Sequence, residues 1–252
     1  MTVLSAGRPQ VDATQLAWLT ELGIDRKLLS SMVDTATLFA PDTPAPQPVE
    51  VIRQTATNVH QPLPDDLRAL AQTVAQCQGC GLHAIRHQTV FGDGVTESPD
   101  WMVIGEVPGD HDDQMGLPFQ GPAGSLLNSM LEAAGILPGA RVFYTNVLKC
   151  RPQGARPPKP EEVHSCLPYL RRQIALIRPS GLLVLGWQAA QALLNQRASL
   201  DQLRGQVHRY QDAGLDIPLV VTHHPASLML RGHLKAAAWH DLHLARKAVL
   251  TN

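Results

Sequence analysis

The sequence predicts an α/β fold in which a parallel sheet lies between two layers of helices. Short apolar runs typical of buried strands alternate with longer stretches of helical periodicity, as expected when both faces of a sheet are covered. The chain has 252 residues, of which 44% are hydrophobic and 17% charged, a composition typical of globular proteins. A chain of this length can bury a substantial core without disulfide bonds.

A proline-rich segment separates the predicted α/β domain, residues 65–252, from a short N-terminal region, residues 1–40. Six prolines fall between residues 41 and 64. Because proline removes a backbone donor and disfavours helix at the preceding residue, we expect this segment to be an extended linker.

The N-terminal region has a helical pattern of its own. Leu16, Leu19 and Leu22 recur at helical spacing, Gly23 can end that helix, and residues 25–38 suit a second one. Two hypotheses remain open: a helical hairpin docked on the main domain, or a protein-docking element tethered by the linker. The docking hypothesis is based on size, because an acidic unit of two helices can bury only a small core on its own.

Within the main domain, strands and helices alternate along the chain. The predicted strands are Trp101–Ile104, Val142–Val147, Gly181–Leu185 and Pro218–Thr222. The predicted helices are Leu126–Ile136, Glu161–Ile177, Gln188–Leu194 and residues 234–249. Three of the strands end in polar, sharply turning segments: residues 105–109, 145–146 and 222–225. Since ligands of open α/β sheets bind at the carboxyl ends of the strands, we expect the functional site there.

Several classes of protein are excluded. No uninterrupted apolar stretch approaches the roughly 20 residues of a membrane span, so we expect no membrane partner. The first twelve residues lack the apolar core of a secretory signal, which predicts a cytoplasmic, nucleoid-associated protein in a reducing compartment. The net charge of −1 argues against binding nucleic acid through bulk charge, as a histone-like protein does. Eight Lys or Arg between residues 141 and 178, against two Glu, nevertheless predict a local basic surface.

The four cysteines of the chain all fall in the main domain. Cys77 and Cys80 form a CxxC pair, whereas Cys150 and Cys166 are separated by fifteen residues. Four thiolates can bind zinc or an iron–sulfur cube. The wide second pair suits a cluster better than a zinc ribbon, although the spacing alone also allows scattered buried cysteines.

Four stretches of the main domain, taken with these cysteines, resemble the family 4 uracil-DNA glycosylases, which carry an iron–sulfur cluster. They are CQGCGLHAIRHQTVFGDG, WMVIGEVPGDHDDQMGLPFQGPAGSLL, VFYTNVLKCRP and VVTHHPASLMLR. They occur in the family's order and cover, with the segments between them, about two-thirds of the chain. The resemblance implies a three-layer α/β/α fold with a central four-stranded parallel sheet, and the hydrolysis of uracil from DNA.

The resemblance also implies a role for individual residues. The catalytic residues would be Glu106, Asn146 and His224. The residues of the base pocket would be Gly105, Val107, Asp112, Phe119 and Asn146, with Phe119 stacking on the flipped base. The residues near the DNA backbone would be Gly124, Ser125 and Arg231. The ligands of a [4Fe–4S] cluster would be Cys77, Cys80, Cys150 and Cys166.

The chemistry of uracil excision explains why such residues would converge. A glycosylase flips the base into a pocket and reads it by stacking and hydrogen bonds. The amide of Asn146 can pair with the adjacent N3–H and O4 of uracil. Breaking the glycosidic bond leaves negative charge on uracil O2, and a donor such as His224 stabilises that charge as it develops.

Two positions depart from the family pattern. Val107 stands where Ala or Gly is usual, which narrows the space expected for the attacking water. Asp112 stands where a Glu is thought to exclude the methyl group of thymine, and it is one methylene shorter. Neither substitution removes the pocket.

Competing functions remain at this point. The chain is expected to be a monomeric glycosylase that acts on uracil-containing DNA. Alternatively, it is a glycosylase-fold accessory subunit of a replication machine. Residues 16–24, LAWLTELGI, faintly resemble the start of the psi subunit of bacterial DNA polymerase III, so residues 1–40 would bind a replication or repair protein. A third hypothesis is a phosphate-binding fold of another function.

Overall fold

The computed structural model describes residues 63–137 and 140–250. These residues belong to one compact unit, His60–Asn252, which is distinct from a second unit, Met1–Val59. The predicted N-terminal helices and nearly all of the linker lie outside the described residues, so both stay predictions.

A six-stranded sheet forms the centre of the described domain. Its strand order is β1-β3-β2-β4-β6-β5. The strands are β1 Asp93–Gly94, β2 Trp101–Gly105, β3 Val142–Asn146, β4 Gly181–Leu185, β5 Val207–Asp212 and β6 Leu215–Thr222. The four central strands are parallel and are the four that the sequence predicts. The expected count of four strands is incomplete, because β1 and β5 add an antiparallel strand at each edge.

The sequence pattern does not predict the two edge strands, and the reason differs between them. β1 has only two residues, both exposed. β5 is exposed along most of its length and buries only Tyr210 fully. It pairs with β6 through a two-residue turn in which Ala213 and Gly214 have φ values of 50° and 77°. Positive φ at both positions is what a type I′ hairpin turn requires.

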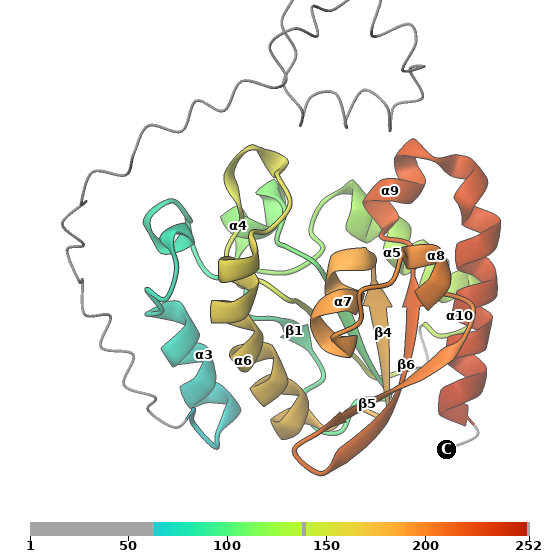
Figure 1. Cartoon of the computed structure of the whole chain (residues 1–252), viewed down its shortest axis with the longest axis horizontal. Helices are drawn as coiled ribbons and strands as arrows, with labels where there is room; N and C mark the ends of the chain where they lie inside the picture. The colour runs from blue at the N-terminus through green and yellow to red at the C-terminus, as the bar shows by residue number, and fades with distance from the viewer. Residues whose placement is uncertain (1–62, 138–139, 251–252) are drawn as a thin grey trace, which may run out of the picture. The chain divides into compact units, whose positions relative to one another are not determined.

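Helices cover both faces of the sheet. One face carries α6 Pro160–Ile177, α7 Trp187–Leu194 and α8 Leu200–Leu203, and α3 Leu67–Ala75 packs on α6. The other face carries α5 Pro122–Ala133 and α10 Lys235–Leu250. Figure 1 shows α3 and α6 on one side of the strands and α10 on the other. The predicted three-layer α/β/α fold is therefore confirmed.

Alternation of side chains along the strands explains the two layers of core. On β2, Met102 and Ile104 pack toward α6, whereas Trp101 and Val103 pack toward α5 and α10. All five residues of β2 are buried, as expected for a strand covered on both faces. No helix of the described residues is long and apolar enough to cross a membrane.

Two short helices begin at the carboxyl ends of strands. α4 Asp110–Met115 follows β2, and α9 Pro225–Leu230 follows β6. The helix α5 begins at Pro122, before the predicted Leu126, because a proline at the first helical position is already in helical conformation. These helix starts surround the carboxyl edge of the sheet.

Candidate active site

The carboxyl ends of the central strands bring the predicted site residues together. Gly105 at the end of β2 is in register with Asn146 at the end of β3, and Leu185 of β4 is in register with Thr222 of β6. A cavity of about 330 Å³ opens at this edge. Its lining includes Val107–Asp112, Phe119, Gly121–Gly124, Arg151, Arg156 and His224.

Asn146 is the most buried polar side chain of the site. It is 1% exposed, and neither its Oδ1 nor its Nδ2 has a hydrogen-bond partner among the described residues. The amide lies against Gly105, where an added Cβ would come within 2.3 Å of Asn146 Oδ1. Buried amides are normally hydrogen-bonded, so this one has a donor and an acceptor left for a ligand.

Phe119 lies beside Asn146 in a strained backbone conformation. Its φ is 58°, in the left-handed region that is uncommon for a non-glycine residue. The ring reaches Gly105, where an added Cβ would lie 2.9 Å from Cζ, and it meets Tyr144 edge-on at a centroid distance of 6.0 Å. Helix α5 packs so closely here that a Cβ on Gly124 would lie 1.7 Å from the Phe119 carbonyl oxygen. The strained turn is therefore fixed by its neighbours.

Glu106 follows β2 and lies against the start of α7. Its Oε1 accepts a hydrogen bond from the backbone N–H of Gln188 (2.9 Å). Gly186 permits this approach, because its φ is 91° and an added Cβ would lie 2.5 Å from the same oxygen. Burial raises the pKa of Glu106, and the hydrogen bond from Gln188 opposes the shift. A carboxylate with a raised pKa is suited to accept a proton near neutral pH.

His224 forms another wall of the cavity and is neutral at physiological pH. Burial lowers its pKa to about 4, with Asp112 acting weakly in the opposite direction. Its Nδ1 accepts a hydrogen bond from the backbone N–H of Ala226 (3.2 Å). In the neutral ring the proton is then on Nε2, which makes that atom a donor. The ring is 6.4 Å from Phe119 between centroids.

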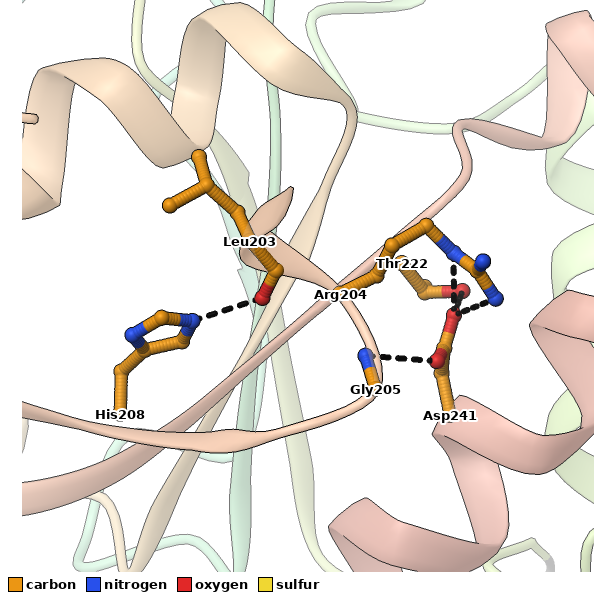
Figure 2. Close-up of polar contacts among 6 residues, drawn as sticks. All are labelled: Leu203, Arg204, Gly205, His208, Thr222 and Asp241. Atoms are coloured by element: carbon orange, nitrogen blue, oxygen red, sulfur yellow. Dashed lines mark hydrogen bonds and ion pairs between the residues drawn. The ribbon is translucent and has the colours of Figure 1, made fainter. Parts of the chain in front are cut away.

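A buried ion pair supports the strand end that precedes His224. Asp241 of α10 is 1% exposed and accepts hydrogen bonds from Arg204 Nη2 (2.8 Å), Thr222 Oγ1 (2.8 Å) and Gly205 N (3.2 Å). Figure 2 shows this carboxylate joining the turn at Arg204–Gly205 to the end of β6, with His208 donating to the Leu203 carbonyl nearby. The sequence does not reveal this network, because its members come from three separate elements.

Asp112 and Val107, the two departures from the family pattern, both lie in the site. Both oxygens of Asp112 accept backbone N–H groups, from Gly109 (3.0 Å) and Gln120 (2.7 Å), so the carboxylate fixes the loop that carries Phe119. Val107 lines the cavity and packs against the buried cluster of Leu82, Leu148 and Cys150.

The sequence assigned no individual role to several cavity residues, among them two arginines and a histidine. Arg151 forms an ion pair with Asp110 across 2.9 Å, Arg156 forms two hydrogen bonds with Glu162, and His111 lies beside Gly121. The basic stretch containing both arginines was the available signal. Of the residues expected near the DNA backbone, Gly124 lines the cavity, whereas Ser125 and Arg231 are exposed outside it.

The four cysteines line a second, small cavity of about 20 Å³ between α3 and α6. Cys77 follows α3, Cys80 precedes a 3₁₀ turn at Gly81–Ala84, Cys150 follows β3, and Cys166 lies within α6. No cysteine is in a disulfide bond. Among the described residues, no group of three or more His, Cys, Asp or Glu side chains is arranged to hold a single metal ion.

Several groups donate hydrogen bonds to the sulfur atoms. Arg86 Nη1 lies 3.3 Å from Cys150 Sγ, the Tyr169 hydroxyl 3.3 Å from Cys77 Sγ, and the backbone N–H of Lys149 3.2 Å from Cys166 Sγ. Burial raises the pKa of the Cys166 thiol to about 12, against the effect of Lys149. Thiols in such a site become thiolates when a metal centre binds them.

The main domain is similar in sequence to known uracil-DNA glycosylases. Residues 91–243 match the family described as "Uracil DNA glycosylase superfamily". A type-4 uracil-DNA glycosylase of Pyrobaculum aerophilum is 38% identical over 181 residues, which are 70% of this chain and 91% of that protein. One of Archaeoglobus fulgidus is 36% identical over 175 residues, 68% of this chain and 87% of that protein. One of Thermotoga maritima is 34% identical over 164 residues, 65% and 83% respectively.

Proposed function

The chain belongs to the uracil-DNA glycosylase superfamily, and from this premise we propose that it hydrolyses the N-glycosidic bond of uracil in DNA. Its relatives from several species are type-4 enzymes, so the family resemblance stated from the sequence is confirmed. The residues at the carboxyl edge of the sheet support the same activity.

The observation that carries the proposal is the unpartnered amide of Asn146. A buried donor and acceptor side by side on one planar group match the O4 and N3–H of uracil. Cytosine presents an exocyclic amine where uracil has O4, and it would place a donor against the Asn146 donor. Phe119 lies beside the amide and supplies an apolar face for the base.

His224 and Glu106 supply the two groups that the reaction needs. As the bond between N1 and C1′ breaks, its electrons pass to the base and charge collects on O2. The neutral Nε2–H of His224 donates to this oxygen most strongly in the transition state. Water adds to C1′ of the sugar, and Glu106 accepts its proton.

Cys77, Cys80, Cys150 and Cys166 would hold the [4Fe–4S] cluster. Four cysteines that line one cavity support a thiolate-bound metal centre, and the wide spacing of Cys150 and Cys166 along the chain favours a cluster over a zinc ribbon. The donors from Arg86, Tyr169 and Lys149 suit thiolate ligands. The cluster would cross-link α3, α6 and the segment after β3, and we assign it a structural role.

DNA would bind across the edge that carries the cavity. Arg151 and Arg156 line it, and their guanidinium groups can pair with phosphates. Both arginines already have carboxylate partners, so phosphates would compete with Asp110 and Glu162.

The test is direct excision. Purified protein is incubated with a labelled oligonucleotide that has one uracil, and abasic sites are then cleaved with alkali. We expect cleavage at the uracil, none in the matched thymine oligonucleotide, and much slower cleavage, still measurable at high enzyme concentration, with Asn146→Ala. Binding of DNA without excision by the wild type, and by Val107→Ala, would contradict the proposal and favour the accessory-subunit hypothesis.

A further inference from the structure

The side chain of Lys149 spans the turn between the base-reading end of β3 and the cysteine cavity. It is 1% exposed, and its Nζ donates hydrogen bonds to the carbonyl oxygen of Asn146 (2.7 Å) and to Thr145 Oγ1 (2.6 Å). Its backbone N–H donates to Cys166 Sγ (3.2 Å). One residue thus contacts both the strand end that carries Asn146 and the wall of the cysteine cavity.

Burying a lysine side chain at this position costs free energy. A buried amine normally pairs with a carboxylate. Among the described residues no carboxylate oxygen lies within 4.0 Å of Lys149 Nζ. Its acceptors are one hydroxyl and one backbone carbonyl, both at the end of β3. Both hydrogen bonds that offset the burial of this amine are therefore made to the end of β3, and they hold it in place.

Asn146 needs support from its backbone, because its side chain has no hydrogen bond of its own among the described residues. On one side, the N–H of Val147 donates to the Gly105 carbonyl (2.9 Å). On the other side, Lys149 holds the Asn146 carbonyl directly.

The second acceptor of Lys149 anchors this arrangement in the core. Thr145 Oγ1 donates to the Phe91 carbonyl (2.8 Å), and Gln173 Nε2 of α6 donates to the same carbonyl (2.9 Å). Thr145 and Gln173 are both 0% exposed. Lys149 thus ties Asn146 to a buried network that reaches α6.

We propose that Lys149 is a positioning residue for uracil recognition, which holds the amide of Asn146 in place through its backbone. The inference rests on the proposed excision of uracil and adds a residue that does not touch the base. Since a displacement of about 1 Å in a site can cost roughly 10²-fold in rate, loss of this anchor should be measurable.

The experiment is a double-mutant cycle on the full-length protein with Lys149→Met and Asn146→Ala. Lys149→Met keeps much of the buried volume and removes the donors. We expect it to lower kcat/KM for uracil excision by about 10- to 100-fold and to weaken binding of free uracil, measured by calorimetry, to a similar extent. In the Asn146→Ala background the same change should cost less than about threefold, because residues that act through one another are not additive. Iron per chain should stay at the wild-type value.

A second variant covers the case in which Lys149→Met fails to fold. Thr145→Val keeps the β-branched shape, removes one acceptor of Lys149, and should show the same non-additivity with Asn146→Ala. Lys235→Met, on an exposed lysine of α10, is the matched control and should behave as the wild type. Full additivity, an unchanged kcat/KM, or loss of iron in the soluble variants would overturn the inference while wild-type excision remained intact. An inert wild type would instead overturn the proposed function, and the inference with it.

Discussion

At the scale of single residues, the protonation state of His224 determines what this side chain can do. A ring whose pKa is about 4 stays neutral through the physiological range and acts as a hydrogen-bond donor without carrying charge. The N–H of Ala226 fixes which nitrogen holds the proton. The catalytic role proposed for His224 therefore depends on where its Nε2–H points and on its distance from the base.

His224→Ala should lower the rate of uracil release by about 10²–10³, the usual cost of losing one donor to a developing oxyanion. Affinity for uracil-containing DNA should change much less, because the charge appears only in the transition state. Single-turnover excision and equilibrium binding separate the two effects. His240→Ala, on an exposed face of α10, is the control. Equal losses in rate and affinity would show that His224 acts in binding.

The low pKa of His224 also makes stability depend on pH. Between about pH 6.5 and 4 the unfolded chain binds a proton at this position and the folded chain does not. The free energy of unfolding should therefore fall as the pH is lowered through this range, and the contribution should be fully retained above pH 6.5. Urea unfolding at about pH 7 and pH 5 should show a smaller loss for His224→Gln than for the wild type. Parallel losses in the two proteins would refute this assignment.

At the scale of elements, the register between β2 and β3 brings together residues of the proposed base pocket. It places Gly105 opposite Asn146, and the absence of a side chain at Gly105 leaves room for both the Asn146 amide and the Phe119 ring. Gly105→Ala should displace both groups and lower kcat/KM by at least about tenfold, measured on the uracil oligonucleotide. At Gly232 an added Cβ meets nothing within 4 Å, so Gly232→Ala should be neutral. An active Gly105→Ala protein would mean that the pocket is more adaptable than this packing suggests.

The packing of α3 on α6 should be the part of the described domain that depends most on the proposed metal centre. Anaerobically purified protein should be yellow-brown, with iron and sulfide near four each per chain, as a cube requires. Cys166→Ser should lose iron and lower the thermal unfolding temperature, because the cluster would link α6, which carries Cys166, to the end of α3. Stoichiometric zinc without visible absorbance would exclude the cluster.

The sequence predicts elements whose packing follows a simple period, and it misses those that depend on distant partners. Strands β2, β3, β4 and β6 are apolar runs, because helices cover them on both faces. The exposed edge strand β5 has no such run, although its Ala213–Gly214 turn was a usable signal.

The same distinction applies to the site. Polar residues after strands predict where it lies, and the family motifs name Asn146 and His224. The contact of Glu106 with Gln188 joins residues 82 positions apart along the chain, at a helix start that carries no motif. The role inferred for Lys149 likewise depends on the turn that folds its amine back over the Asn146 carbonyl.

At the scale of the whole molecule, residues 60–252 form a unit separate from residues 1–59. A shortened chain that begins at His60 should fold and excise uracil with kcat/KM within about twofold of the full-length protein, since the site lies entirely in the second unit. The shortened chain would lose any protein contact made by the N-terminal region. In the full-length protein, the strength of that contact would depend on the effective concentration that the linker sets. Failure of the shortened chain to fold would instead make residues 1–59 part of the core.

The buried amide of Asn146, which has no hydrogen-bond partner in the part of the chain that the structure describes, affects the stability of the whole fold. A buried donor or acceptor without a partner costs about 1–3 kcal/mol, and a domain is stable by only about 5–15 kcal/mol. Selection for stability alone would favour a leucine at this position, filling the same space without polar atoms. An asparagine at this position therefore lowers the stability of the ligand-free protein, and its proposed recognition of uracil would account for its presence there.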